Sequence, residues 1–141
     1  MSGFLLDTNC ISELLHGRPE PRVVDWLRAA DESLLYLSVL TLGEIRSGAA
    51  FLSQSKRRTQ LEIWLELDLQ VRFAERILGI NEAIADRWGW LTAEAKRRGR
   101  PLAAVDGLLA ATALHHNLTI VSRNVSDFSS SQVAVLNPWE A

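Results

Sequence analysis

Short apolar runs alternate with amphipathic segments along the whole chain. The apolar runs cover residues 4–6, 34–39, 77–80, 118–122 and 133–136. The longer segments between them carry apolar residues at helical spacing. This alternation is typical of a parallel sheet whose strands are joined by crossover helices. The sequence therefore predicts an α/β fold with a mostly parallel central sheet flanked by helices.

The clearest predicted helix covers residues 82–98. Asn81 is a suitable N-cap, and Gly99 stands where helices commonly end. One face of this helix carries its apolar residues, which are Ile84, Trp88, Leu91 and Ala95. Further back, residues 53–70 contain a polar SQSKRRTQ run followed by LEIWLELDL. This segment predicts a second helical pair or hairpin that packs on the sheet.

Composition favours one ordinary globular domain that covers residues 1–141. The chain has 141 residues, of which 48% are hydrophobic and 23% charged. Its net charge of −2 excludes the overall basic field of a protein that coats nucleic acid, so any such role needs a local patch. The single cysteine cannot form an internal disulfide, and no signal peptide or membrane-spanning run is evident. We expect a soluble, cytoplasmic protein.

Acidic and amide side chains follow the predicted strands. Asp7 ends the first apolar run, and Glu44 lies shortly after the second, in TLGEIRSG. Asp106 begins the segment DGLLAATALHH, whereas Asn124 and Asp127 follow the strand predicted at residues 118–122. Ligands of parallel α/β sheets bind beyond the carboxyl ends of the strands, where separate loops converge. We therefore expect these residues to share one site.

A shared acidic site predicts a bound cation. Neighbouring carboxylates repel one another and raise one another's pKa unless a positive charge neutralises them. The candidate ligands here are oxygen atoms, without a thiolate or imidazole cluster. This set favours Mg²⁺ or Mn²⁺ over Zn²⁺.

Several of these acids also have a purely structural explanation. Asp106 could be a helix N-cap, and TLGE matches a capping box in which Glu44 would serve only the helix. Asp127 could form a loop turn. Asp7 is hardest to explain in this way, because Asn9 could cap the next helix equally well. These alternatives stay open for each residue, and only the joint placement after strands favours a site.

Four stretches together resemble a known family: LLDTNCISELL, TLGEIRSG, AAVDGLLAATALHHNLTIVSRNVSDF and the closing VLNPWEA. The chain resembles PIN-domain ribonucleases, specifically the VapC-type toxins of bacterial toxin–antitoxin pairs, over essentially its whole length. The Asn-Pro-Trp ending is similar to the FitB-like subgroup. The resemblance implies a PIN-like three-layer fold and metal-dependent hydrolysis of RNA phosphodiester bonds.

The resemblance also implies a set of catalytic and metal-binding residues. Asp7, Glu44 and Asp106 match the family's acids. The fourth acidic position follows a Ser/Thr-Arg pair, where this chain has the neutral Asn124. Asp127 lies three residues further on and is an alternative fourth ligand. The carboxylates would position a Mg²⁺ or Mn²⁺ ion and water rather than attack the phosphate themselves.

The neighbouring polar residues would orient these acids. Thr8 and Asn9, from the D-T-N motif, are expected to hydrogen-bond to nearby carboxylates. Asn9 also argues against a haloacid-dehalogenase-like phosphatase, which needs a second aspartate there. A response-regulator receiver would need paired acids after the first strand, and these are absent. A PIN fold that has lost catalysis and acts only by binding a partner remains an alternative.

The resemblance implies three kinds of partner, namely an RNA substrate, a small DNA-binding antitoxin and a second copy of the chain. A homodimer is expected, within a possible higher-order toxin–antitoxin complex and without a membrane. The basic residues that we consider for RNA or antitoxin contact are Arg46, Lys96, Arg97, Arg98 and Arg100. A solvated helix face is the alternative for the run at 96–100. Arg46, one turn beyond Glu44, could instead pair with the site's carboxylates.

Overall fold

The computed structural model describes residues 3–140 and contains a five-stranded, fully parallel sheet in the order β3-β2-β1-β4-β5. The first strand along the chain lies at the centre, because β1 pairs with both β2 and β4. All five predicted apolar runs contain a strand. The strands are β1 (Phe4–Leu6), β2 (Leu35–Ser38), β3 (Ile77–Leu78), β4 (Thr119–Val121) and β5 (Val135–Leu136).

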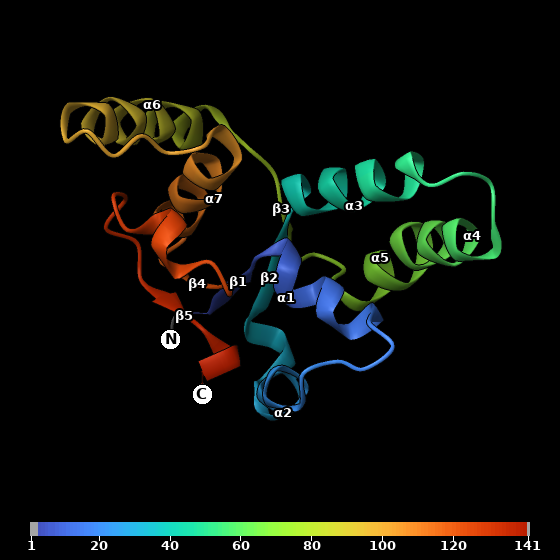
Figure 1. Ribbon diagram of the computed structural model, residues 1–141. Helices are drawn as coiled ribbons and strands as arrows, with labels where there is room; N and C mark the ends of the chain where they lie inside the picture. Colours follow the sequence, from blue (N-terminus) through green and yellow to red (C-terminus); the bar gives the residue numbers. More distant parts are fainter. Residues whose placement is uncertain (1–2, 141) are drawn as a thin grey trace.

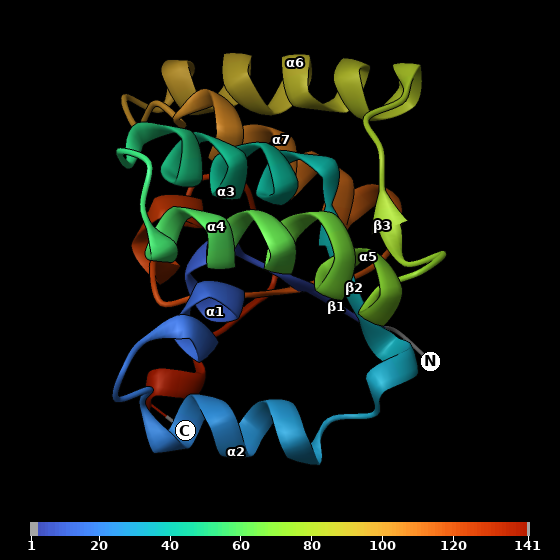
Figure 2. The same cartoon turned by 90° about the vertical axis from the view of Figure 1, so that its right-hand side faces the viewer.

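Helices cover both faces of this sheet (Figure 1). They are α1 (Thr8–Ser12), α2 (Pro21–Ala29), α3 (Val39–Phe51), α4 (Lys56–Ile63), α5 (Leu69–Arg72), α6 (Glu82–Arg97) and α7 (Ala104–His115). In Figure 1, α6 and α7 form one arm, and α3 with α4 forms another, with α1 between them at the base. Figure 2 shows α6, α3 and α4 stacked above one another, with α2 at the opposite end.

The two faces of the sheet have separate hydrophobic cores. Leu5 and Leu6 are neighbours in β1, yet Leu5 packs with the α7 side and Leu6 with the side of α1 to α5. This follows from the alternation of side chains along a strand. A sheet buried on both faces needs continuous apolar strands, as the sequence shows. The predicted three-layer arrangement is confirmed.

The predicted helix signals are also present. Oδ1 of Asn81 accepts a hydrogen bond from the backbone N–H of Ile84 (2.9 Å), so Asn81 caps α6 as expected. Gly99 follows this helix with φ of +70°, a conformation that favours glycine. The segment 53–70 is helical as predicted, but it does not form a helical pair or hairpin by itself: α4 continues through the π-helix Trp64–Asp68 into α5. Among residues 3–140, no helix combines the length and hydropathy that a membrane span requires.

Candidate metal centre

Asp7 stands at the end of β1 and is held by hydrogen bonds from several directions. Its backbone N–H donates to the carbonyl of Val121 in β4 (2.9 Å). Its Oδ1 accepts from the backbone N–H of Thr8 (2.8 Å), and its Oδ2 accepts from Ser122 Oγ (2.8 Å). Asn9 Nδ2 lies 3.4 Å from the same Oδ2. Asp7 is therefore the N-cap of α1, rather than Asn9, and only 8% of its surface is exposed.

Glu44 lies inside α3, where it faces the loop that follows β1. The capping-box explanation for this residue is wrong, because the N-cap of α3 is Ser38, whose Oγ accepts from the N–H of Leu40 (3.0 Å). Glu44 is instead bound by Thr8, whose hydroxyl donates to Glu44 Oε1 (2.5 Å) and lies 3.2 Å from the hydroxyl of Thr41. Thr8 thus links the end of β1 to α3.

Asp106 approaches from the opposite arm, in the first turn of α7. It is not the helix cap, because Ala103 occupies the N-cap position without a side-chain hydrogen bond. Burial raises the pKa of Asp106 to about 6, and the charges of Asp127, Asp7 and Glu44 contribute to the same rise. Because the charges of these three acids act on Asp106, the four acidic residues lie in one neighbourhood.

Asp127 belongs to the same acidic group. It lies in the short 3-10 helix Val125–Phe128, and its charge raises the pKa of both Asp7 and Asp106. Asn124, which we considered as the fourth ligand, begins that 3-10 helix and contributes its backbone N–H to Ser122 Oγ (3.0 Å). The structure thus brings the charge of Asp127 to the acids. Asp127 therefore stays the alternative fourth ligand beside Asn124.

Burial is also the main cause of the raised pKa of Asp7. The hydrogen bonds from Ser122 and from the backbone of Thr8 act in the opposite direction and favour the charged form. The charges of Glu44 and Asp127 raise this pKa further. A site in which carboxylates raise one another's pKa favours the binding of a cation.

Ser122 is a part of this site to which the sequence analysis gave no role. Its side chain is fully buried, and besides its bond to Asp7 it lies 3.2 Å from Asn9 Nδ2. Asn9 in turn accepts a hydrogen bond from the backbone N–H of Arg123 through Oδ1 (3.3 Å). Thr8 and Asn9 therefore make the expected hydrogen bonds to neighbouring acids. Ser122 directly follows β4, which pairs with β1. Its place at the end of this neighbouring strand was the sequence signal that could have assigned it to the site.

Most of the candidate basic residues form ion pairs outside the acidic group. Arg46 does not pair with the site's carboxylates, as one expectation had it: its guanidinium binds Glu66 (2.6 Å) and Glu62 (3.4 Å). At the end of α6, Arg97 and Arg98 both pair with Glu94. The Arg46 pairs join α3 to the α4 segment, whereas the pairs of Arg97 and Arg98 lie within α6 and at its C-terminal end. Lys96 and Arg100 are exposed.

The donor set fits a hard divalent cation. The acids that face one another are Asp7, Glu44, Asp106 and Asp127, and they offer only oxygen atoms. Within residues 3–140, however, no three acidic, histidine or cysteine side chains are close enough to ligate one ion directly. The acids thus surround a shared space without forming a closed cage. Such a site suits an ion that keeps several of its water ligands, as Mg²⁺ does.

Fold and site together define an α/β protein with a group of acidic residues at the carboxyl ends of its parallel strands. The PIN domain model matches residues 4–130, and the chain belongs to this family. Toxin FitB of Neisseria gonorrhoeae is 42% identical over 135 residues, which span 96% of this chain and 97% of that protein. VapC ribonuclease Y4jK of Sinorhizobium fredii is 36% identical over 96% of this chain and 97% of its own length.

A solved structure agrees with these relatives in three dimensions. The crystal structure of FitAcB from Neisseria gonorrhoeae matches with a TM-score of 0.93 at 41% identity and covers 98% of this chain and 99% of that one. A second structure, of FitAB bound to a DNA fragment, matches with a TM-score of 0.91 at 40% identity, over 96% of this chain and 95% of that one. The fold predicted from the resemblance is therefore confirmed.

Proposed function

We propose that this chain is a metal-dependent endoribonuclease that acts as the toxin of a type II toxin–antitoxin pair. The observation that carries the proposal is the convergence of Asp7, Glu44, Asp106 and Asp127 from four separate parts of the chain. The relatives supply the reaction class, because they are named as ribonucleases and toxins over nearly their full length. Hydrolysis of RNA phosphodiester bonds is the activity that both observations support.

In this proposal, Asp7, Glu44 and Asp106 bind Mg²⁺ or Mn²⁺. Asp127 supplies a fourth negative charge, while the amide oxygen of Asn124 is the alternative at this position. The bound ion would provide Lewis acidity, which stabilises charge on the phosphate and makes a water molecule a better nucleophile. The protein's part is to hold the carboxylates in place and to orient the phosphate beside them.

The polar neighbours serve this positioning. Thr8 fixes one oxygen of Glu44, and Asn9 with Ser122 fixes Oδ2 of Asp7. The second oxygen of Glu44 stays available to a cation, whereas Oδ1 of Asp7 also accepts from the backbone N–H of Thr8 and would bind the ion through a further lone pair. Asp7 and Glu44 thus keep defined orientations, and the cost of ordering them is met when the chain folds.

The partners in this proposal are an RNA substrate and a small DNA-binding antitoxin that inhibits the enzyme. Solved relatives are toxin–antitoxin complexes, and one of them is bound to DNA. We infer that this chain also forms a homodimer and enters a higher-order complex with its antitoxin, in the cytoplasm. Among the basic residues considered at the start, Lys96 and Arg100 remain candidates for RNA or antitoxin contact.

The proposal is tested by incubating the purified chain with a mixed RNA pool, with and without Mn²⁺. We expect cleavage that requires the metal and that Glu44→Gln abolishes. The glutamine keeps an oxygen that can accept the Thr8 hydrogen bond, so the fold should persist while the charge is lost. An absence of cleavage would instead support a PIN fold that acts only by binding its partner, and metal-independent cleavage would contradict the metal-dependent mechanism.

A further inference from the structure

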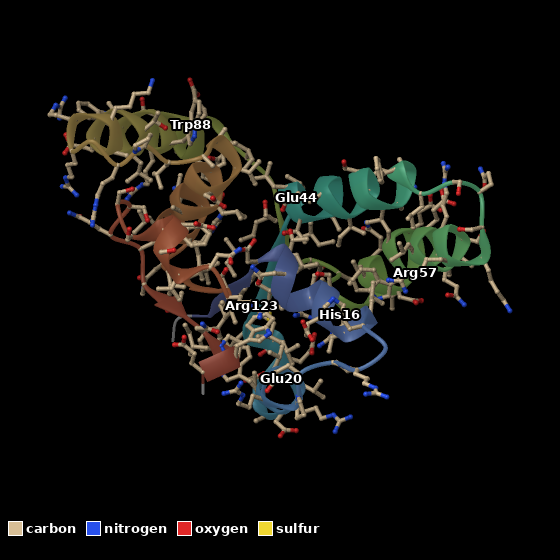
Figure 3. The ribbon with its side chains drawn as sticks, in the orientation of Figure 1. His16, Glu20, Glu44, Arg57, Trp88 and Arg123 are labelled. Atoms are coloured by element: carbon tan, nitrogen blue, oxygen red, sulfur yellow. The ribbon has the colours of Figure 1, made fainter. Side chains whose placement is uncertain are left out.

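A pocket of about 340 Å³ lies directly beside the acidic centre. It is bounded by α1, α3 and α4 and by the segment that follows α1. Thr8 and Glu44 belong both to the acidic centre and to the wall of this pocket. In Figure 3, the labelled residues Glu44, His16 and Arg57 come from three of these bounding segments. The pocket is thus an extension of the site.

The lining divides into an apolar part and a polar part. Ile45, Leu61 and the half-buried Trp64 provide apolar surface, and Trp64 begins the π-helical segment between α4 and α5. Arg57 and Nε2 of His16 provide hydrogen-bonding groups on the same lining, while Nδ1 of His16 lies 3.2 Å from Glu13 Oε2. Apolar and aromatic surface bordered by hydrogen-bond donors suits a flat, heteroaromatic ring.

Arg57 is a free cation on this lining. The neighbouring Arg58 pairs with Glu62 and donates to the carbonyl of Leu52, and Arg46 also pairs with Glu62. Among the residues that the structure describes, Arg57 has no ion pair, and it is exposed. An unpaired arginine beside a groove can contact phosphate without first losing a carboxylate partner.

We propose that this pocket receives one base of the RNA strand, next to the phosphate that is cleaved, and that Arg57 contacts the adjoining backbone. The inference rests on the proposed function. A phosphate held by the acids must bring its flanking nucleotide within reach of Glu44, and Glu44 is part of the pocket wall. The pocket is therefore where base preference is set, through Trp64 and His16.

Gly48 provides a way to fill the pocket without disturbing the fold. It lines the pocket within α3, and a Cβ added there would meet nothing within 4 Å. Gly48→Leu should therefore fold normally, and leucine favours the helix more than glycine does. Gly89→Leu is the matched control, because Gly89 lies in α6, is equally open and is not part of the pocket.

Binding is measured in the Asp7→Asn background, so that RNA is not cleaved. The probes are four fluorescein-labelled ten-residue RNAs, each made of a single base, and the readout is fluorescence anisotropy. We expect the parent to prefer one or two bases. Gly48→Leu should weaken the preferred RNA roughly tenfold and make the four affinities nearly equal. Gly89→Leu should leave both affinity and preference unchanged.

The backbone contact is tested by its salt dependence. Arg57→Met should reduce the slope of log affinity against log salt by roughly 0.7, the value for one phosphate contact to a single strand. It should act similarly on all four RNAs. Lys56→Met removes the same charge from the preceding residue, which does not line the pocket, and should leave the slope unchanged.

Two outcomes would overturn the pocket assignment while leaving the proposed function intact. In the first, wild type and Gly48→Leu cleave the RNA pool at equal rates, and Gly48→Leu retains the base preference. In the second, Gly48→Leu loses the co-expressed antitoxin but handles RNA normally, which assigns the pocket to the protein partner. If the wild type binds the RNAs but cleaves none, the proposed function fails, and the binding comparison still decides the pocket.

Discussion

Asp7 and Asp106 face the same acidic space, yet the protein holds them by different means. Asp7 ends a central strand, and its carboxylate accepts hydrogen bonds from Thr8, Asn9 and Ser122. The Asp106 carboxylate receives no hydrogen bond from residues 3–140, and its position depends on how α7 packs. Hydrogen bonds thus fix Asp7, whereas the packing of α7 against α6 fixes Asp106.

The packing that places Asp106 centres on Gly107. Gly107 is buried, and a Cβ there would lie 3.0 Å from Cδ1 and Nε1 of Trp88 in α6, the residue labelled in Figure 3. The indole Nε1 is buried without a hydrogen-bond partner in the described part of the chain. The close approach of α6 and α7 thus leaves this donor unsatisfied, which costs free energy. We therefore expect the region around Asp7 to be most sensitive to the loss of hydrogen bonds. The region around Gly107 should be most sensitive to added side-chain volume.

The largest effect should come from removing the charge of the strand-borne acid. Asp7→Asn should lower RNA cleavage by roughly 1,000-fold or more, because the carboxylate no longer binds the cation. In the wild type, Mn²⁺ at 100 times its dissociation constant should raise the melting temperature by about 5–10 °C. Asp7→Asn should show no such rise, while Asp25→Asn on the exposed face of α2 should keep it. A persisting rise in Asp7→Asn would remove Asp7 from the metal centre.

The next effect tests the helix-borne acid through its packing. Gly107→Ala should destabilise the metal-free protein by about 1 kcal/mol, since strain against Trp88 outweighs the gain in helix propensity. Gly89→Ala, in the open part of α6, should stabilise it by up to about 1 kcal/mol. Chemical unfolding in urea measures both. Gly107→Ala should also weaken Mn²⁺ binding severalfold, and unchanged binding would show that Asp106 does not depend on this contact.

The difference between Asp7, which local patterns place, and Asp106, which depends on helix packing, also explains what the sequence could predict. The strands, the cap at Asn81 and the positions of the acids follow from local patterns that need only a few neighbouring residues. Asp7 and Glu44 could be placed near one another because parallel strands end at one edge. The contacts between distant segments could not be predicted, since Ser122 and Asp7 are 115 residues apart in the sequence. Gly107 gave no signal either, because its role depends on a residue in another helix.

Asn124 and Asp127 show a further limit of the motif. The family pattern puts the acid directly after Ser122 and Arg123, so spacing alone favours Asn124. The structure starts a 3-10 helix there, and one turn of that helix carries Asp127 towards the acids. We propose that this charge, three residues later, compensates for the neutral amide. Sequence spacing identifies the loop but does not decide between its two side chains.

A smaller effect should therefore separate these two residues. Asp127→Asn should weaken Mn²⁺ binding by roughly three- to tenfold, because it removes a charge that acts on both Asp7 and Asp106. Asn124→Asp should change the affinity little, since Asp127 already supplies the negative charge. Isothermal titration of the free protein with Mn²⁺ gives both values. The reverse pattern would make Asn124 the fourth ligand.

The smallest effect is a dependence of stability on pH that arises at Asp106. Burial and the neighbouring acids raise its pKa from 3.8 to about 6, so the folded state binds this proton more tightly than the unfolded state does. In the metal-free protein, stability should then fall as pH rises from about 4 to about 6, and the loss should persist above that range. Because Asp106 is only partly buried, solvent screening should limit the effect to about 1 kcal/mol or less. Urea unfolding in EDTA at pH 4.5 and pH 7.5 measures it.

Asp106→Asn should be more stable than the wild type at pH 7.5 and should show a shallower decline between the two pH values. The decline should not vanish, because the raised pKa of Asp7 acts in the same direction. An equal decline in the variant would mean that Asp106 is not held against the other acids, and that α7 packs without bringing it to the site.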